Sequence, residues 1–125
     1  MLLMLLCQLT MISAQNQIDQ MVEKFSATGD CTFTSAVERD PKTRRIVKVV
    51  KVLELGNTSV SRFKAAFEAE RNTGTYRVKT EGDEVTIVLS TNNSKTNRIY
   101  MLKYEKEGKY FSEAKITIII KFVNP

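Results

Sequence analysis

The stretch AKITIIIKFV, residues 114–123, decides the fold class of this chain. Its even-numbered residues are all apolar, whereas its odd-numbered residues include Lys115, Thr117 and Lys121. A period of two residues is typical of a β-strand with one face in a core. We therefore expect a long strand whose even face, through Phe122, packs against helices. We expect its odd face to begin any partner-binding surface.

Two earlier segments have helical periodicity instead. Apolar residues at i, i+3, i+4 and i+7 predict a helix over residues 16–27, and a similar stripe predicts a second helix from residue 58 or 59 to 71. Glycines follow both segments and are natural helix terminators. The residues expected to face the sheet are Ile18, Met21, Val22 and Phe25 in the first helix and Val60, Phe63 and Phe67 in the second.

The remaining segments have strand patterns. Strands are predicted over residues 31–38, 75–80, 84–90 and 98–105, in addition to 114–123. Residues 45–55 fit either a strand or a helix, because their apolar positions satisfy both periods. Their many valines and the preceding Asp40-Pro41 turn favour a strand that forms a hairpin with residues 31–38, in an interior position.

Short connections between these segments favour antiparallel pairing, since parallel neighbours need long crossovers. The sequence therefore predicts an α+β fold with the order α-β-β-α-β-β-β-β. One antiparallel sheet of about six strands would carry two helices packed on one face.

The composition argues against most enzyme classes. The 125 residues carry a net charge of +5 and include no histidine. Histidine is the usual general base near neutral pH and the commonest metal ligand, and the sequence has no evident pairing of a nucleophile with a base. We expect a protein without catalytic activity, cofactor or metal site.

Residues 1–15 form an apolar run without charge that ends in Ser13-Ala14-Gln15. Small residues before a polar start are typical of a signal-peptidase site, although a basic residue at the beginning is missing. A membrane-spanning helix needs about 20 apolar residues, so this run is too short to be one. We expect a signal peptide at 1–15 and a single α+β domain at 16–125. The alternative is an apolar first element of the mature fold. If residues 1–15 are removed as a signal peptide, Cys31 is the one remaining cysteine, and we expect a structural role for it.

Two groups of side chains are candidate ligand-binding sites. The first is a basic hairpin, which could hold an anionic polymer such as an acidic glycan, or simply protect a sheet edge from pairing. The second interleaves basic and aromatic residues, as in stacking platforms for sugars or nucleic acid, although tyrosines also serve as cross-strand partners. The first comprises Arg39, Lys42, Arg44, Arg45, Lys48 and Lys51, and the second Arg98, Tyr100, Lys103 and Tyr104, with Lys106, Lys109, Tyr110 and Phe111.

The Ser-Ala-Gln ending at residue 15, the segment IDQMVEKF at 18–25 and the hairpin TFTSAVERDPKTRRIVKVVKVLEL at 32–55 resemble small secreted domains of unknown function from gut Bacteroidetes. The resemblance covers nearly all of residues 16–125. It implies a periplasmic or cell-surface location and an α+β sheet fold. It implies no functional residue, because this family has no agreed activity.

We therefore expect an exported accessory or binding domain that contacts a protein or glycan of the cell envelope through an exposed sheet face. We do not expect nucleic acid as a partner of an exported protein. The alternatives are a binder of anionic polymer through the basic hairpin, a small hydrolase with an unrecognised site, and a cystatin-like inhibitory domain. Only the analogy of a helix ahead of an antiparallel sheet supports the last of these.

Overall fold

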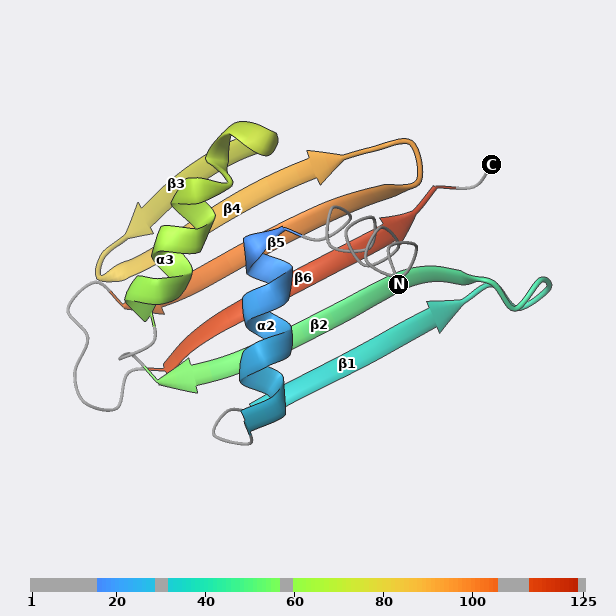
Figure 1. Ribbon diagram of the computed structural model, residues 1–125, viewed down its shortest axis with the longest axis horizontal. Helices are drawn as coiled ribbons and strands as arrows, with labels where there is room; N and C mark the ends of the chain where they lie inside the picture. Colours follow the sequence, from blue (N-terminus) through green and yellow to red (C-terminus); the bar gives the residue numbers. More distant parts are fainter. Residues whose placement is uncertain (1–15, 29–31, 57–59, 106–112, 124–125) are drawn as a thin grey trace, which may run out of the picture.

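The computed structural model describes residues 16–28, 32–56, 60–105 and 113–123 (Figure 1). They form two helices, one short 3-10 helix and six strands in the expected order α-β-β-α-β-β-β-β. The expected signal peptide and Cys31 lie outside the described residues. The elements are α2 (Gln17–Thr28), β1 (Thr32–Arg39), β2 (Ile46–Gly56), α3 (Val60–Ala69), η2 (Arg71–Thr73), β3 (Thr75–Glu81), β4 (Glu84–Asn92), β5 (Thr96–Glu105) and β6 (Glu113–Phe122).

The strands form one antiparallel sheet in the order β1-β2-β6-β5-β4-β3. Strands β3 to β6 follow one another as a meander, and the β1–β2 hairpin is added beside β6. The segment from β2 to β3 must cross to the far edge of the sheet, and α3 makes this crossing. The predicted α+β class, with six strands and two helices on one face, is confirmed (Figure 1).

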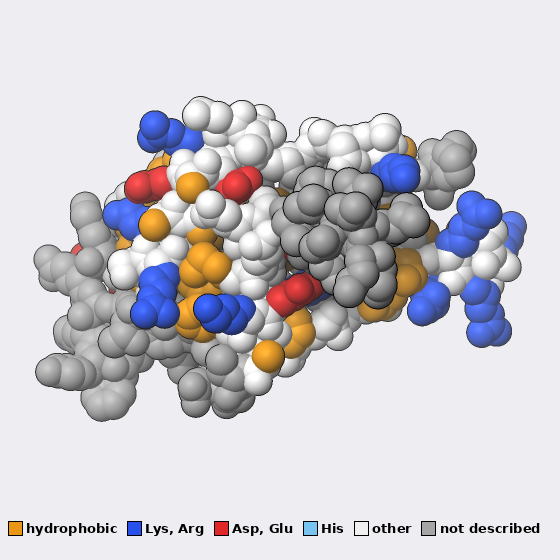
Figure 2. Space-filling model, viewed as in Figure 1, with side chains coloured by type: hydrophobic (Ala, Val, Ile, Leu, Met, Phe, Trp, Pro, Cys, Tyr) orange, Lys and Arg blue, Asp and Glu red, His pale blue; other side chains and the backbone are white. Residues whose placement is uncertain are grey.

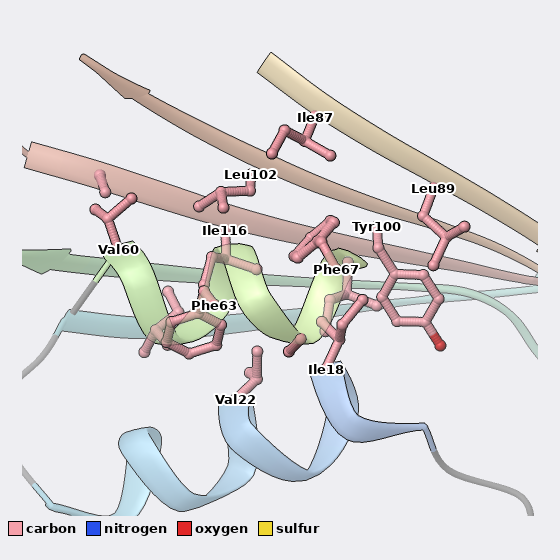
Figure 3. Close-up of a cluster of buried hydrophobic side chains, with 14 of the residues drawn as sticks. Ile18, Val22, Val60, Phe63, Phe67, Ile87, Leu89, Tyr100, Leu102 and Ile116 are labelled. Atoms are coloured by element: carbon pink, nitrogen blue, oxygen red, sulfur yellow. The ribbon is translucent and has the colours of Figure 1, made fainter. Parts of the chain in front are cut away.

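Both helices pack on the same face of the sheet, which we call the covered face. Figure 3 shows their apolar side chains meeting those of β4, β5 and β6. Ile18, Phe63 and Phe67 are fully buried there, as are Ile116 and Leu102 from the strands. Burial of one such side chain contributes about 1.5–3 kcal/mol, so this layer is the main source of stability. The helices also touch each other through the rings of Phe25 and Phe63, whose centroids lie 5.0 Å apart.

The segment 45–55, which fitted two periods, forms strand β2 from Ile46 to Gly56, as the valine content indicated. Strand β2 lies inside the sheet, between β1 and β6, and this position explains its apolar residues on both faces. Leu53 is fully buried under the helices, while Val50 and Val52 are half-buried on the opposite side.

The structure corrects two details. Phe122 was expected in the core, but its side chain is 40 % exposed because β6 runs past the part of the sheet that the helices cover. The second helix was expected to reach residue 71, but α3 ends at Ala69. The backbone N–H of Glu70 donates to the carbonyl oxygens of both Ala66 and Phe67, and this shared bond tightens the chain into η2.

Candidate functional site

The second candidate group is divided between the two faces of the sheet. Arg98, Tyr100 and Tyr104 lie on the covered face, because their partners in β6 and β4 include Ile118, Ile120 and Val85. Lys103 lies on the other side, the open face, opposite Lys115. The alternation of β5 therefore separates the lysine from the aromatic residues.

The structure corrects the expected position of Tyr100. Its side chain is 1 % exposed and belongs to the core, so its ring cannot serve as a stacking surface for a ligand. Tyr104 is partly buried and packs against the same core. Lys106, Lys109, Tyr110 and Phe111 lie outside the described residues.

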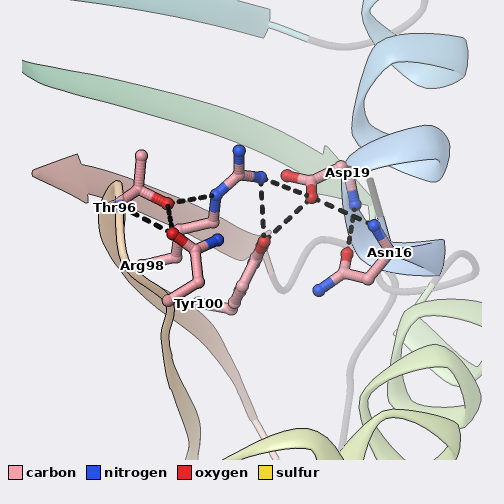
Figure 4. Close-up of polar contacts among 6 residues, drawn as sticks. Asn16, Asp19, Thr96, Arg98 and Tyr100 are labelled. Carbon is pink, nitrogen blue, oxygen red and sulfur yellow. Dashed lines mark hydrogen bonds and ion pairs between the residues drawn. The ribbon is translucent and has the colours of Figure 1, made fainter. Parts of the chain in front are cut away.

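The hydroxyl of Tyr100 takes part in a buried polar contact with Asp19 of α2 (Figure 4). It donates to Asp19 Oδ2 at 2.8 Å, and Arg98 Nη1 donates to the same oxygen at 3.1 Å. Asp19 is 4 % exposed, although it is charged and lies in the first turn of the helix. The contact ties the start of α2 to the middle of β5.

Asp19 also caps its own helix. Its backbone N–H donates to Asn16 Oδ1 at 2.9 Å, and its Oδ2 accepts from the backbone N–H of Asn16 at 3.3 Å. This reciprocal pair is a capping box, with Asn16 as the N-cap and Asp19 three residues later. A negative side chain at this position also interacts favourably with the helix dipole.

The environment keeps Tyr100 protonated and Arg98 charged. Burial raises the pKa of the Tyr100 hydroxyl above that of a free tyrosine, and the Asp19 carboxylate adds to this increase while Arg98 opposes it. Burial alone would lower the pKa of Arg98, but its contacts with Tyr100 and Asp19 outweigh burial and raise it. Tyr100 is therefore a hydrogen-bond donor throughout the physiological range. The cluster acts as a structural link.

The first candidate group surrounds the turn between β1 and β2, where Figure 2 shows several Lys and Arg side chains gathered. Asp40 organises this turn, because its Oδ1 accepts from the backbone N–H groups of Lys42 and Thr43 at 2.7 and 3.1 Å. These two bonds lower the pKa of Asp40. Arg39 Nη1 donates to the carbonyl oxygen of Arg44 at 3.0 Å.

Arg44 has the one positive φ among the described residues other than glycine, at 63°. An L-residue with a Cβ atom is strained in this left-handed region, where glycine or asparagine is the usual choice. Arg44 and Arg45 are exposed, and Lys48 is half-buried on the open face. Lys51 lies on the covered face opposite Ile118 and so is separated from the group.

Lys103 takes part in a charged row on the open face. Its Nζ lies 3.3 Å from Glu84 Oε1, and Lys115 Nζ lies 3.8 Å from Glu54 Oε1. Lys79 pairs with Glu81 at 2.9 Å and lines a surface hollow with Lys103 and Thr86. All these lysines and their partners are substantially exposed, so each pair contributes little to stability.

Beside this row the open face carries apolar side chains in two adjacent rungs of the sheet. In one rung Val50, Ile119 and Ile99 are neighbours, and in the next Val52, Thr117, Met101 and Val88 are neighbours. We call the six apolar residues of these rungs the apolar band. All six are half-buried, and none belongs to the core or to the partly buried side chains packed on it. The band consists of Val50, Val52, Val88, Ile99, Met101 and Ile119.

Within the described residues there is no group of acidic and cysteine side chains that could hold a metal ion. Nor does that part of the chain contain a helix that is long and apolar enough to cross a membrane.

A comparison with family models matches residues 15–119 to DUF5024, a domain of unknown function. The chain belongs to the DUF5024 family. The match begins next to the predicted cleavage position and covers all six strands but the end of β6. No curated protein and no solved structure matches the chain. The expected membership in a family of unknown function is therefore confirmed.

Sequence reasoning missed Asp19, the most buried charged residue in the described part of this DUF5024 domain. Asp19 was assigned no role, although the pattern of Asn16 followed by an acidic residue at position 19 is a signal for a helix start. That signal predicts the capping box. It does not predict the contact with Tyr100, which is 81 residues away in the sequence.

Proposed function

We propose that this chain is an exported, non-enzymatic binding domain that holds a protein partner on the open face of its sheet. The observation that carries the proposal is the apolar band. Its six side chains are half-buried without helping to form the core, and no described helix lies over them. Apolar side chains gathered in this way on a surface are typical of protein interaction sites.

The charge around the band also suits a protein surface. Lys48 and Lys121 are paired on one side of it, and Lys103 and Lys115 on the other. An apolar centre with a charged rim is the usual anatomy of a protein interface. The rim provides specificity, while burial of the band provides most of the affinity.

Export is supported by the sequence of residues 1–15, an apolar run that ends in small residues. A periplasmic or cell-surface location in a Bacteroidetes host would agree with the resemblance of the chain to secreted domains. Sequencing of the amino terminus of the protein recovered from its native host tests this part. We expect the mature chain to begin at Gln15 or Asn16, and a chain that retains Met1 would contradict export by cleavage.

The absence of catalysis is supported by the chain's lack of histidine and by the pairing of its buried polar groups with one another. Asp19 and Tyr100 are buried and bonded to each other, and the half-buried Arg98 also donates to Asp19. The exposed carboxylates Glu54 and Glu84 each face a lysine.

Position-specific photo-crosslinking tests the binding surface. A benzophenone side chain is introduced in the native host either at Met101, in the band, or at Lys64, which is exposed on α3. We expect one defined protein adduct from position 101 and none from position 64. The additional substitution Ile99→Glu should abolish the adduct while the fold is retained. Equal labelling from both positions, or none from position 101, would contradict the proposal.

A second candidate function, the binding of anionic polymer, is favoured by one specific observation. Arg44 occupies a left-handed position where its side chain costs conformational energy, and such strain tends to persist where a side chain has a function. Protection of a sheet edge does not explain the group well. The edge strand is β1, whereas Arg44 and Arg45 lie in the turn and Lys48 lies on an interior strand.

The variant Arg44→Asn separates these roles. Relief of the strain should raise the free energy of unfolding by about 0.5–1 kcal/mol, measured by denaturant titration. If the turn binds anionic polymer, the same variant should lower retention on a heparin column, and the matched control Arg62→Asn on α3 should lower it less. Equal retention of the two variants would contradict this second function.

A further inference from the structure

The lysines of the open face form two rows, one on each side of the apolar band. Lys48 and Lys121 are neighbours one rung from Val50 and Ile119. Lys115 and Lys103 are neighbours one rung from Thr117 and Met101 on the other side, and Lys79 extends this second row into β3. The band therefore lies between two rungs in which lysines predominate, because these five lysines share the rungs with two glutamates, Glu38 opposite Lys48 and Glu54 opposite Lys115.

The spacing of these rows leaves room for an α-helix between them. Residues on one face of a strand recur at about 6.8 Å, so rows three rungs apart are separated by roughly 20 Å. A helix with its side chains is about 10–12 Å wide and fits between the rows, within reach of both. The band crosses β4, β5, β6 and β2, a distance of about 15 Å that roughly ten helical residues cover.

A second copy of this chain does not suit the face. If two open faces pack with their bands in contact, a lysine row meets another lysine row in either orientation. Like charges brought together in this way oppose association. An anionic lipid surface suits the face poorly as well, because a flat bilayer that meets the second lysine row also meets Glu84 and Glu81, which lie beside it.

A helix with acidic side chains along both flanks is complementary to this arrangement. Its apolar stripe would cover the band, and its carboxylates would meet Lys48 and Lys121 on one side and Lys103 and Lys115 on the other. The existing pairs of Lys103 with Glu84 and of Lys115 with Glu54 are exposed and long, at 3.3 and 3.8 Å, so these lysines can turn to a partner at little cost.

We propose that the open face binds an amphipathic α-helix of a partner protein, which lies across the strands with its apolar stripe on the band between two lysine rows and carries Asp or Glu along both flanks. This inference rests on the proposed function and names the chemistry of its partner. The helix-in-groove mode of recognition uses the same combination of an apolar stripe and complementary flanks.

A display library of helical peptides tests the proposal on the full chain. Each peptide has leucines at i, i+3, i+4 and i+7, and its flanking positions are randomised among acidic, basic and neutral residues. We expect the selected peptides to be acidic on both flanks. Binding of a selected synthetic peptide should weaken by roughly tenfold or more with Met101→Asp, and by about two- to fivefold for each of Lys48→Glu and Lys103→Glu. Lys64→Glu on α3 is the matched charge control and should have no effect.

Selection of basic or neutral flanks, or of no peptide at all, would overturn the helix proposal. So would peptides that bind equally well to the Met101→Asp variant, since they would occupy another surface. Three probes identify the other occupants: sedimentation for a second copy, phosphatidylglycerol vesicles for a lipid surface, and a synthetic peptide of residues 1–15 for a segment of this chain. A positive result from any of them at the band also overturns it. If the peptide test fails but crosslinking from position 101 still gives a protein adduct, the open face binds a protein and only the helical form of the partner is wrong. If crosslinking gives no adduct, the proposed function fails as well.

Discussion

Removal of one oxygen atom, by Tyr100→Phe, tests whether the link between α2 and β5 stabilises the fold. A hydrogen bond to a charged group contributes about 1.5–3 kcal/mol. The hydroxyl donates to Asp19 Oδ2 at 2.8 Å in the core, whereas Asp19 retains Arg98 and Asn16 as donors in the variant. No buried charge is left without a partner in the variant. We therefore expect the free energy of unfolding to fall by about 2 kcal/mol, which corresponds to a decrease of roughly 6–10 °C in the thermal midpoint.

Tyr104→Phe is the matched control, since Tyr104 lies on the same strand and the same face. Its ring is half-buried, and the structure describes no hydrogen bond of its hydroxyl. This control should change stability by less than about 0.5 kcal/mol. Both variants are measured by urea titration at pH 7. If Tyr100→Phe and Tyr104→Phe lower the urea midpoint equally, the hydrogen bond to Asp19 contributes nothing to stability and our reasoning is refuted.

The same tyrosine should make the fold sensitive to alkali. Its folded pKa lies above the unfolded value of 10.0, so its stabilising effect is complete below pH 10 and is lost as the pH rises toward the folded pKa. Between pH 9 and 12 the free energy of unfolding should therefore fall more for the wild type than for Tyr100→Phe. Parallel plots of the free energy of unfolding against pH for the two proteins would contradict this. Ile118→Asp should unfold the domain, because Ile118 is 1 % exposed, whereas Thr117→Asp on the open face should leave a cooperative thermal transition by circular dichroism. Loss of that transition in both variants would mean that the faces of β6 are assigned wrongly. Gly74→Ala should lower the free energy of unfolding by more than about 2 kcal/mol, because a Cβ atom at this position would lie 2.0 Å from the backbone oxygen of Ser90. An unchanged urea midpoint would contradict this and would show that β3 can move to make room.

The fold could be predicted from the sequence because its elements are strongly periodic. The alternation in residues 114–123 assigned the faces of β6, and the stripe with Phe63 and Phe67 assigned the face of α3. Where two periods overlapped, in residues 45–55, the β-branched content decided correctly. Phe122 was misplaced because periodicity says which face a residue occupies but not how far the covering helices extend.

The candidate sites were harder to predict, because proximity in sequence is not proximity in space on a strand. Arg98, Tyr100 and Lys103 looked like one group, yet alternate residues of β5 point to opposite faces. The strained backbone of Arg44 has no local signal beyond its place after a turn. The lysine rows became visible only when the register of the strands was known, since each row combines residues from several strands.

The position of β6 within the sheet has a consequence for the timing of folding. This strand follows all the other described strands in the chain, yet within the sheet it lies between β2 and β5 and so joins the β1–β2 hairpin to the β3–β4–β5 meander. Until β6 has been synthesised, the two parts of the sheet are not paired with each other, and the core lacks the buried side chains of β6, such as Ile116 and Ile118. The complete sheet can therefore form only after β6, the last described strand, has been made. A protein that must remain unfolded during passage through a membrane would benefit from such a delay.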